Sequence, residues 1–153
     1  MESNTVLYRI TGLSGLVEHG DELVAMTFPR ESREGSIRQE NINAAQSSLR
    51  DKSSGFDLEH QGDERFVRVR DVDDETGHRF FYFERNANGS LAFRGVCSES
   101  WGGGPQSDPS LAVCDITYPL EGLIVYFEVS EKVFIAHGEE IAKRVLEVVR
   151  ANQ

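Results

Sequence analysis

The chain is poor in cations relative to anions, and this imbalance excludes some classes of partner. Its 153 residues include 16 Lys or Arg against 26 Asp or Glu, which gives a net charge of −10 at pH 7. Because nucleic-acid binding needs clustered cations to neutralise phosphates, we expect no nucleic-acid partner. An anionic membrane surface is disfavoured for the same reason. The acidity suits a basic protein partner, although its general effect is to keep a protein soluble.

Long hydrophobic runs are also missing. No window approaches the ~20 apolar residues that a membrane span needs, so we expect no membrane insertion. The first ten residues carry Glu2 and no long apolar segment, and therefore do not resemble a signal peptide. The sequence thus predicts a cytoplasmic protein. The alternative is a periplasmic protein whose leader has been removed and whose cysteines form a disulfide.

Cysteine is scarce, and the two present allow a single pairing, Cys97 with Cys114. If they lie on neighbouring strands, a disulfide closing this loop would stabilise the fold by about 3 kcal/mol in the chain-entropy model. The alternative is a pair of buried thiols in a reducing compartment. The sequence leaves both interpretations open.

Motifs for catalysis and cofactor binding are absent. The cysteines and histidines show no close-spaced pair for zinc, and the acidic segment 71–77 places its glycine one position too late for an EF-hand loop. There is no nucleophile elbow and no Walker loop, and Gly102–Gly104 lies between expected strands instead of opening a helix. We therefore expect no catalytic residues, no metal and no cofactor.

Hydrophobic periodicity predicts one α+β domain over residues 1–153, built on a single antiparallel sheet of five to seven strands. Alternating or β-rich patterns predict strands near 5–10, 23–28, 56–60, 66–72, 79–84, 91–97, 111–118 and 123–129. A helical pattern with Ser36 as its cap predicts a short helix over 37–51. A stronger apolar stripe predicts a C-terminal helix that Gly138 interrupts, with its main part at 138–150.

The final helix should cover one face of the sheet, because its apolar stripe needs a partner of similar size. Strand alternation puts Phe81 and Phe83 on one face and Phe80 and Tyr82 on the other. The second face of the sheet is expected to be partly open, in keeping with the arginines at 65–70 and these aromatic pairs.

Two acidic segments are candidate partner-binding sites. The first is the long loop between the cysteines, where Trp101 lies near Glu99 and Asp108; long loops in compact domains are often functional, and Trp is enriched in binding hot spots. A structural plug over the sheet end is the alternative role of Trp101. The second is an acidic, solvated hairpin tip formed by Asp71, Asp73, Asp74 and Glu75.

The segment 97–153 resembles the closing part of immunity proteins that neutralise bacterial type VI secretion effectors. The resemblance is carried by Cys97, by Cys114-Asp-Ile-Thr-Tyr118, by Gly122-Leu-Ile-Val-Tyr-Phe127, and by Phe134, Glu140-Ile141 and Val145-Leu146. It implies paired cysteines on adjacent strands, a final helix that covers the sheet, and a non-catalytic protein that covers a toxin's active site.

Two other functions are consistent with the sequence. One is an enzyme or small-ligand carrier with a pocket between the sheet and the C-terminal helix. The other is a structural or oligomeric component that uses its sheet face. We expect instead a non-enzymatic binding protein with a basic toxin or effector as its partner.

Overall fold

A computed structural model of the chain shows an α+β fold with a single antiparallel sheet and two helices. The structure describes residues 5–18, 20–50, 59–60, 65–71, 73–74, 78–98 and 112–153. The strands are β1 (Val6–Ile10), β2 (Leu23–Pro29), β3 (Glu59–His60), β4 (Phe66–Arg70), β5 (Arg79–Arg85), β6 (Leu91–Ser98), β7 (Val113–Leu120) and β8 (Leu123–Ser130). The helices are α1 (Arg33–Arg50) and α2 (Glu131–Ala151). The predicted fold class is confirmed.

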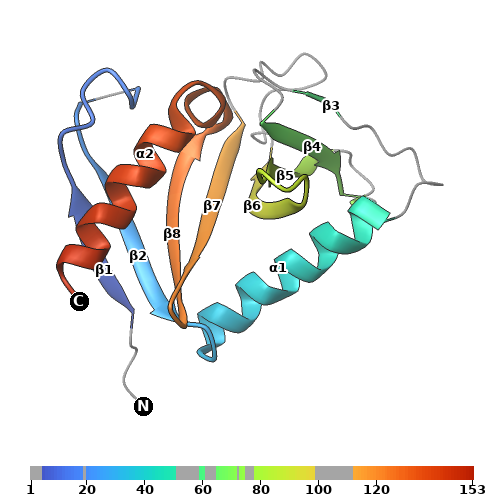
Figure 1. Ribbon diagram of the computed structural model, residues 1–153, viewed down its shortest axis with the longest axis horizontal. Coiled ribbons are helices and arrows are strands. Elements are labelled where there is room, and N and C mark those ends of the chain that lie inside the picture. Colours follow the sequence, from blue (N-terminus) through green and yellow to red (C-terminus); the bar gives the residue numbers. More distant parts are fainter. Residues whose placement is uncertain are drawn as a thin grey trace.

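The sheet runs in the order β1-β2-β8-β7-β6-β5-β4-β3, and every neighbouring pair is antiparallel. Seven of its strands have five residues or more, and β3 adds a two-residue eighth strand. The N-terminal hairpin β1–β2 therefore lies beside β8, far from β3–β6. Figure 1 shows β1, β2, β8 and β7 on one side of the molecule and β4–β6 on the other.

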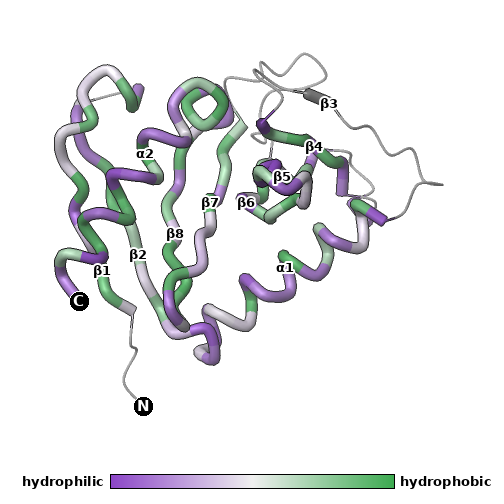
Figure 2. The backbone as a smooth tube through the Cα atoms, viewed as in Figure 1, coloured by the Kyte–Doolittle hydropathy of each residue, from purple (hydrophilic) through white to green (hydrophobic). Residues whose placement is uncertain are grey.

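Helix α2 packs along one face of the sheet and forms the larger hydrophobic core. Ser130 caps it by accepting a hydrogen bond from the Val133 N–H at 3.1 Å. Hydrophilic and hydrophobic residues alternate along α2 (Figure 2). Its apolar stripe is buried against the sheet, and its charged residues other than Glu131 are exposed. The helix is continuous, so the predicted interruption at Gly138 is wrong. Gly138 instead makes room for the ring of Phe134, because a Cβ at position 138 would lie 2.7 Å from that ring.

Helix α1 crosses the opposite face of the sheet. It begins at Arg33, four residues before the predicted start, because Ser32 and not Ser36 is the capping residue. The Ser32 hydroxyl donates to the Pro29 carbonyl at 2.6 Å and accepts from the Gly35 N–H at 3.1 Å. A side chain at Gly35 could not fit, since its Cβ would lie 2.3 Å from the Arg30 carbonyl oxygen.

The side chains of β5 alternate between the two faces of the sheet, as the sequence predicts. Phe80 and Tyr82 belong to the core beneath α2, and Phe81 and Phe83 belong to the core beneath α1. All four side chains are buried, however, so the expectation of an open face near these aromatics is wrong. Helix α1 covers Phe81 and Phe83 by burying Ala45 against this end of the sheet, and Phe134 of α2 packs on Tyr82 on the other face.

Cys97 and Cys114 form a disulfide between directly paired positions of β6 and β7. Both residues are fully buried. Among the described residues, no helix is long and apolar enough to cross a membrane.

Candidate binding site

Among the described residues, helix α1 leaves one corner of its own sheet face uncovered, and this corner is the candidate site. In the strand register Leu7 pairs with Met26, and Met26 pairs with Tyr126, so their side chains lie in one row on the face that carries α1. Arg9 and Val24 form the next row. We call this surface the open face. It is formed by Leu7, Arg9, Val24, Met26, Tyr126 and Glu128.

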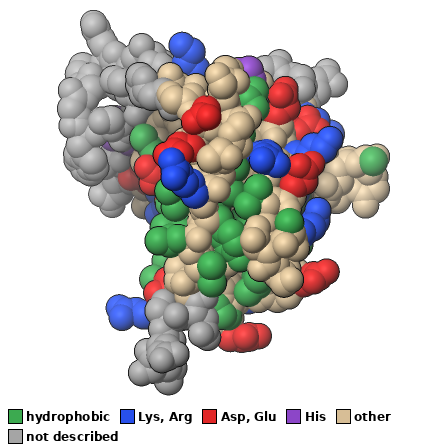
Figure 3. Space-filling view, turned by 90° about the vertical axis from the view of Figure 1, so that its left-hand side faces the viewer, with side chains coloured by type: hydrophobic (Ala, Val, Ile, Leu, Met, Phe, Trp, Pro, Cys, Tyr) green, Lys and Arg blue, Asp and Glu red, His purple; other side chains and the backbone are tan. Residues whose placement is uncertain are grey.

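Large apolar side chains are exposed to solvent on and beside the open face. Leu7 is 65% exposed, Val24 is 56% exposed, and Ile37 in the second turn of α1 is 48% exposed. Seen from the side that carries β1, hydrophobic side chains run down the middle of the molecule, with charged side chains above them (Figure 3). A contiguous exposed apolar patch rimmed by polar groups is typical of an interaction site.

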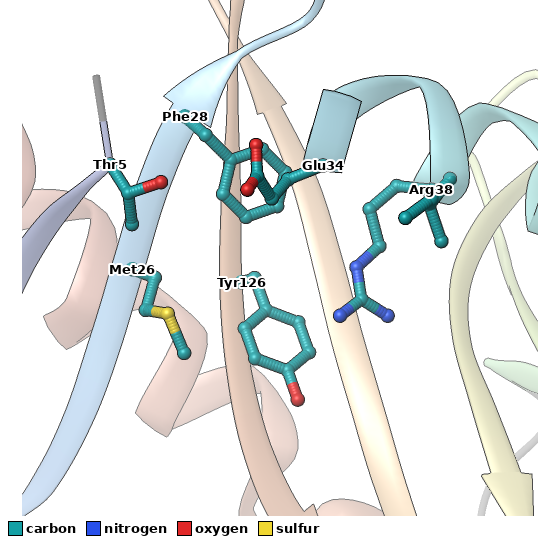
Figure 4. A pocket seen from close by; sticks show the side chains of 7 residues that line it. Thr5, Met26, Phe28, Glu34, Arg38 and Tyr126 are labelled. Carbon is teal, nitrogen blue, oxygen red and sulfur yellow. The ribbon is translucent and has the colours of Figure 1, made fainter. Parts of the chain in front are cut away.

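A groove separates the open face from the first turns of α1. Its volume is about 180 Å³, and it is lined by Thr5, Met26, Phe28, Glu34, Ile37, Arg38 and Tyr126. Figure 4 shows the strand residues on one side and Glu34 and Arg38 reaching in from the helix. An apolar floor with a carboxylate at one side can accept a side chain that has an apolar stem and a positive end, such as Lys or Arg.

A polar cluster fixes the wall of the groove where α1 crosses β8. The Tyr126 hydroxyl donates to the Asp115 carboxylate at 2.9 Å and lies 3.4 Å from the Glu128 carboxylate. The Arg38 guanidinium lies 4.3 Å from the centre of the Tyr126 ring and 3.5 Å from the Asp115 carboxylate. Each group therefore has a partner, and the helix is held at a defined distance from the sheet.

This environment keeps the Tyr126 hydroxyl protonated. Burial of the hydroxyl is the largest cause that raises its pKa above the ordinary range, and the Asp115 and Glu128 carboxylates raise it further. Arg38 opposes them with a smaller effect. Tyr126 is thus a stable hydrogen-bond donor to Asp115 at physiological pH and not a general base.

The cations at the open face and its groove are paired, whereas two carboxylates there form no salt bridge with a described residue. Arg9 is paired with Glu22 at 2.6 Å, and Arg38 is paired with Asp115. Glu34 lines the groove and Glu128 is exposed, and no cation among the described residues forms a salt bridge with either. The face therefore presents apolar surface together with negative charge.

The predicted site residues are only partly described. Trp101, Glu99, Asp108 and Glu75 lie outside the described residues, and their role in binding stays a prediction. The flanks of the Trp101 loop, Ser98 and Ala112, are described and lie at the end of β6 and just before β7.

The acidic hairpin tip is described in part, and two of its carboxylates act inside the turn. Asp71 is buried, accepts from the Asp73 N–H at 3.0 Å and lies 3.6 Å from the Arg79 guanidinium. Asp74 accepts from the Arg79 N–H at 2.8 Å. Of these three aspartates Asp73 is exposed, Asp74 is half-buried and Asp71 is buried, so Asp73 is the most accessible to a partner.

Sequence reasoning did not find the open face. The strand pattern at 5–10 and 23–28 is visible, but nothing local shows that α1 crosses the far end of the sheet. One signal was available: Val24, Met26 and Phe28 make one side of the second strand apolar, and Leu23 and Ala25 make the other side largely apolar as well. The strand therefore carries apolar side chains on both faces, although a single helix covers only one face at a time.

The described residues contain no group of three or more His, Cys, Asp or Glu side chains placed to hold a metal ion. What the geometry offers is a preformed surface with an apolar groove and fixed charges, which suits binding. Comparison with protein-family models, with curated proteins and with solved structures finds no match.

Proposed function

We propose that this chain is a non-enzymatic, acidic binding protein that neutralises a more basic protein partner, namely a bacterial toxin or effector. The observation that carries the proposal is the open face. It combines exposed Leu7 and Val24 with a groove beside α1, and such a surface on one domain is typical of a protein–protein contact.

Charge supports a basic partner. The chain carries a net charge of −10, and Glu34 in the groove and Glu128 on the open face form no salt bridge with a described residue. Opposite charge on the partner would speed encounter, while a few anchors in the groove would supply affinity. The affinity of the complex should therefore fall as salt is raised.

The resemblance to type VI immunity proteins is a second support. In that family paired cysteines lie on adjacent strands before a helix that covers the sheet. The Cys97–Cys114 disulfide and α2 have this arrangement here. A buried disulfide is typical of proteins from oxidising compartments, so it favours the periplasmic alternative over the cytoplasm.

The experiment that tests the proposal has two stages. The tagged chain is used as bait for lysate proteins at low salt, beside a Val24→Glu variant that adds a charge in the middle of the open face. A protein that wild type retains and the variant loses is then identified and expressed alone and together with this chain. We expect it to be basic, to inhibit growth when alone, and to be harmless in the presence of this chain.

A matched control is Val113→Glu. Val113 is a second exposed valine, 42% exposed, on β7, two strands away from β2. It should retain the partner and should unfold at the same urea concentration as Val24→Glu. The proposal fails if both variants retain the partner equally, or if the retained protein is not toxic.

The alternative of an enzyme or carrier places its pocket between the sheet and α2. A second groove, at the edge of that interface near the start of α2, has a volume of about 210 Å³, is open to solvent, and is lined by Leu23, Val129 and Val133 together with glutamates. Apolar side chains fill the middle of the interface, where Phe134, Ile141, Val145 and Val149 are fully buried. This packing does not favour the alternative. A ligand that shifts the unfolding temperature without contacting the open face would favour it.

A further inference from the structure

Strand β1 is the outer strand at its end of the sheet. It pairs with β2 through five residue pairs, from Val6 with Thr27 to Ile10 with Leu23, and it has no second neighbour among the described residues. Backbone N–H and C=O groups of an antiparallel strand point alternately to its two sides. About half of those in residues 6–10 therefore point away from β2, where a further strand could bind.

Several features that usually protect an edge strand are missing from β1. Its sequence, Val-Leu-Tyr-Arg-Ile, contains neither Pro nor Lys, and its register with β2 runs without a bulge. Its single charged side chain, Arg9, is already paired with Glu22. Val6 and Leu7 are 46% and 65% exposed, one on each face of the sheet.

The edge and the open face are continuous. Leu7 begins the row that passes through Met26 to Tyr126, so a strand added beside β1 would extend this row by one side chain. Every second side chain of that added strand would lie on the open face, and the others would lie on the α2 side next to Val6.

We propose that an extended, basic segment of a protein partner binds by adding a strand to β1. This inference rests on the proposed function and specifies its partner. Asp21 of the β1–β2 connection is exposed and lies beyond the Ile10 end of the edge, next to Glu22, which is paired with Arg9. The Asp21 carboxylate favours Lys or Arg at that end of the added strand. Arg144 reaches the same connection from α2, donating to the Thr11 carbonyl, so the cationic side chains should lie on the side away from α2.

A second copy of this chain is the competing occupant, and charge argues against it. A dimer through β1 would bring together two chains that each carry a net charge of −10. A basic segment would instead gain from the same charge.

The test uses a synthetic peptide as the probe. A ten-residue peptide of alternating Val and Lys, capped at both ends, is titrated into the isotope-labelled full chain while backbone amide resonances are followed. We expect shifts and slowed amide exchange in residues 6–10, with smaller shifts in β2. The matched peptide of alternating Val and Glu should cause none.

N-methylation separates strand addition from contact through side chains alone. Two versions of the Val/Lys peptide carry methyl groups on alternate amides, one version in each of the two possible sets. Because only one set of amides faces β1 in a β-ladder, one version should bind at least about tenfold more weakly while the other binds as before.

Several results would overturn the inference. One is that the amide resonances of residues 6–10 do not respond to the Val/Lys peptide. Another is that both methylated versions bind equally more weakly. A third is that these resonances shift with protein concentration alone and a sizing experiment shows a dimer. The last result would assign the edge to a second copy.

Two proline variants distinguish failure of this inference from failure of the proposed function. Val6→Pro and Leu7→Pro each remove one N–H, and alternation means that one of them removes a group facing away from β2. Amide exchange in the unmodified protein identifies that residue, because an N–H that is not hydrogen-bonded to β2 exchanges faster. That variant should keep its fold and lose the captured partner. If it keeps the partner while Val24→Glu loses it, strand addition is wrong and the proposed function stands.

Discussion

Tyr126 joins three parts of the candidate site through one side chain. The Tyr126 hydroxyl donates to the Asp115 carboxylate on β7, and the Arg38 guanidinium of α1 lies over the Tyr126 ring. The same side chain lines the groove. A residue of this kind fixes the distance between helix and sheet. Its contribution can be separated into a hydroxyl part and a ring part.

Replacing Tyr126 by Phe keeps the ring and removes the hydroxyl. We expect a loss of about 1 kcal/mol in the free energy of unfolding, because Asp115 loses a donor while remaining partly exposed to water. Urea denaturation measures it. In a double-mutant cycle with Asp115→Asn the two losses should not add; strictly additive losses would show that the hydrogen bond contributes nothing.

Tyr118 makes stability sensitive to alkaline pH. Burial raises its pKa to about 12 from the ordinary 10.0, and Arg94 opposes this shift with a smaller effect. The folded state therefore favours the protonated form. Its stabilising effect is complete below pH 10 and is lost as pH rises toward 12.

The corresponding measurement compares urea midpoints just below pH 10 and near pH 12 for wild type and Tyr118→Phe. The wild type should lose more stability over this range than the variant, which has one tyrosine fewer to ionise. Parallel curves for the two proteins would show that Tyr118 does not titrate differently in the folded and unfolded states.

At the scale of elements, the disulfide links β6 and β7 at the centre of the sheet order. A double variant, Cys97→Ala with Cys114→Ala, should lose about 3 kcal/mol, mainly because the unfolded chain is no longer cross-linked. Urea unfolding with and without reductant measures this. Reductant should lower the midpoint of the wild type and leave the double variant unchanged; a wild type that is insensitive to reductant even when unfolded would contradict the disulfide.

Helix α2 provides a second test at this scale. Alanine at position 138 would improve helix propensity by about 1 kcal/mol, but its Cβ would lie 2.7 Å from the fully buried ring of Phe134. Because that ring cannot move away within a packed core, we expect a net loss of about 1–3 kcal/mol. The exposed Ala136, changed to Gly, is the control and should lose about 1 kcal/mol from propensity alone. A Gly138→Ala protein as stable as wild type would refute this packing.

An element could be predicted from the sequence where the residues that determine it lie within the element itself. The strands and the apolar stripe of α2 follow from periodicity within the segment. The start of α1 was missed because Ser32 and Ser36 are both residue types that cap helices. In the structure Ser32 accepts from the Gly35 N–H, and Gly35 allows the close approach of the Arg30 carbonyl that this start requires. The continuity of α2 at Gly138 was missed because its cause is the contact with Phe134.

For the whole molecule, the order of the strands in the sheet is the feature that could not be predicted from the sequence. The fold class follows from the pattern, but the position of β1–β2 beside β8 and the diagonal path of α1 do not. These two facts create the open face and bury Phe81 and Phe83, where the sequence favoured exposure. The predicted Trp101 loop is a separate candidate for the same contact and can be examined in the same experiment.

Hydrogen–deuterium exchange of the chain, alone and with its captured partner, tests the central claim most directly. We predict that the partner slows exchange in residues 5–10 and 23–29 and in the first turns of α1, which together form the open face and its edge. Protection of the Trp101 loop in addition would extend the contact. Protection that leaves β1 and β2 unchanged would contradict the account.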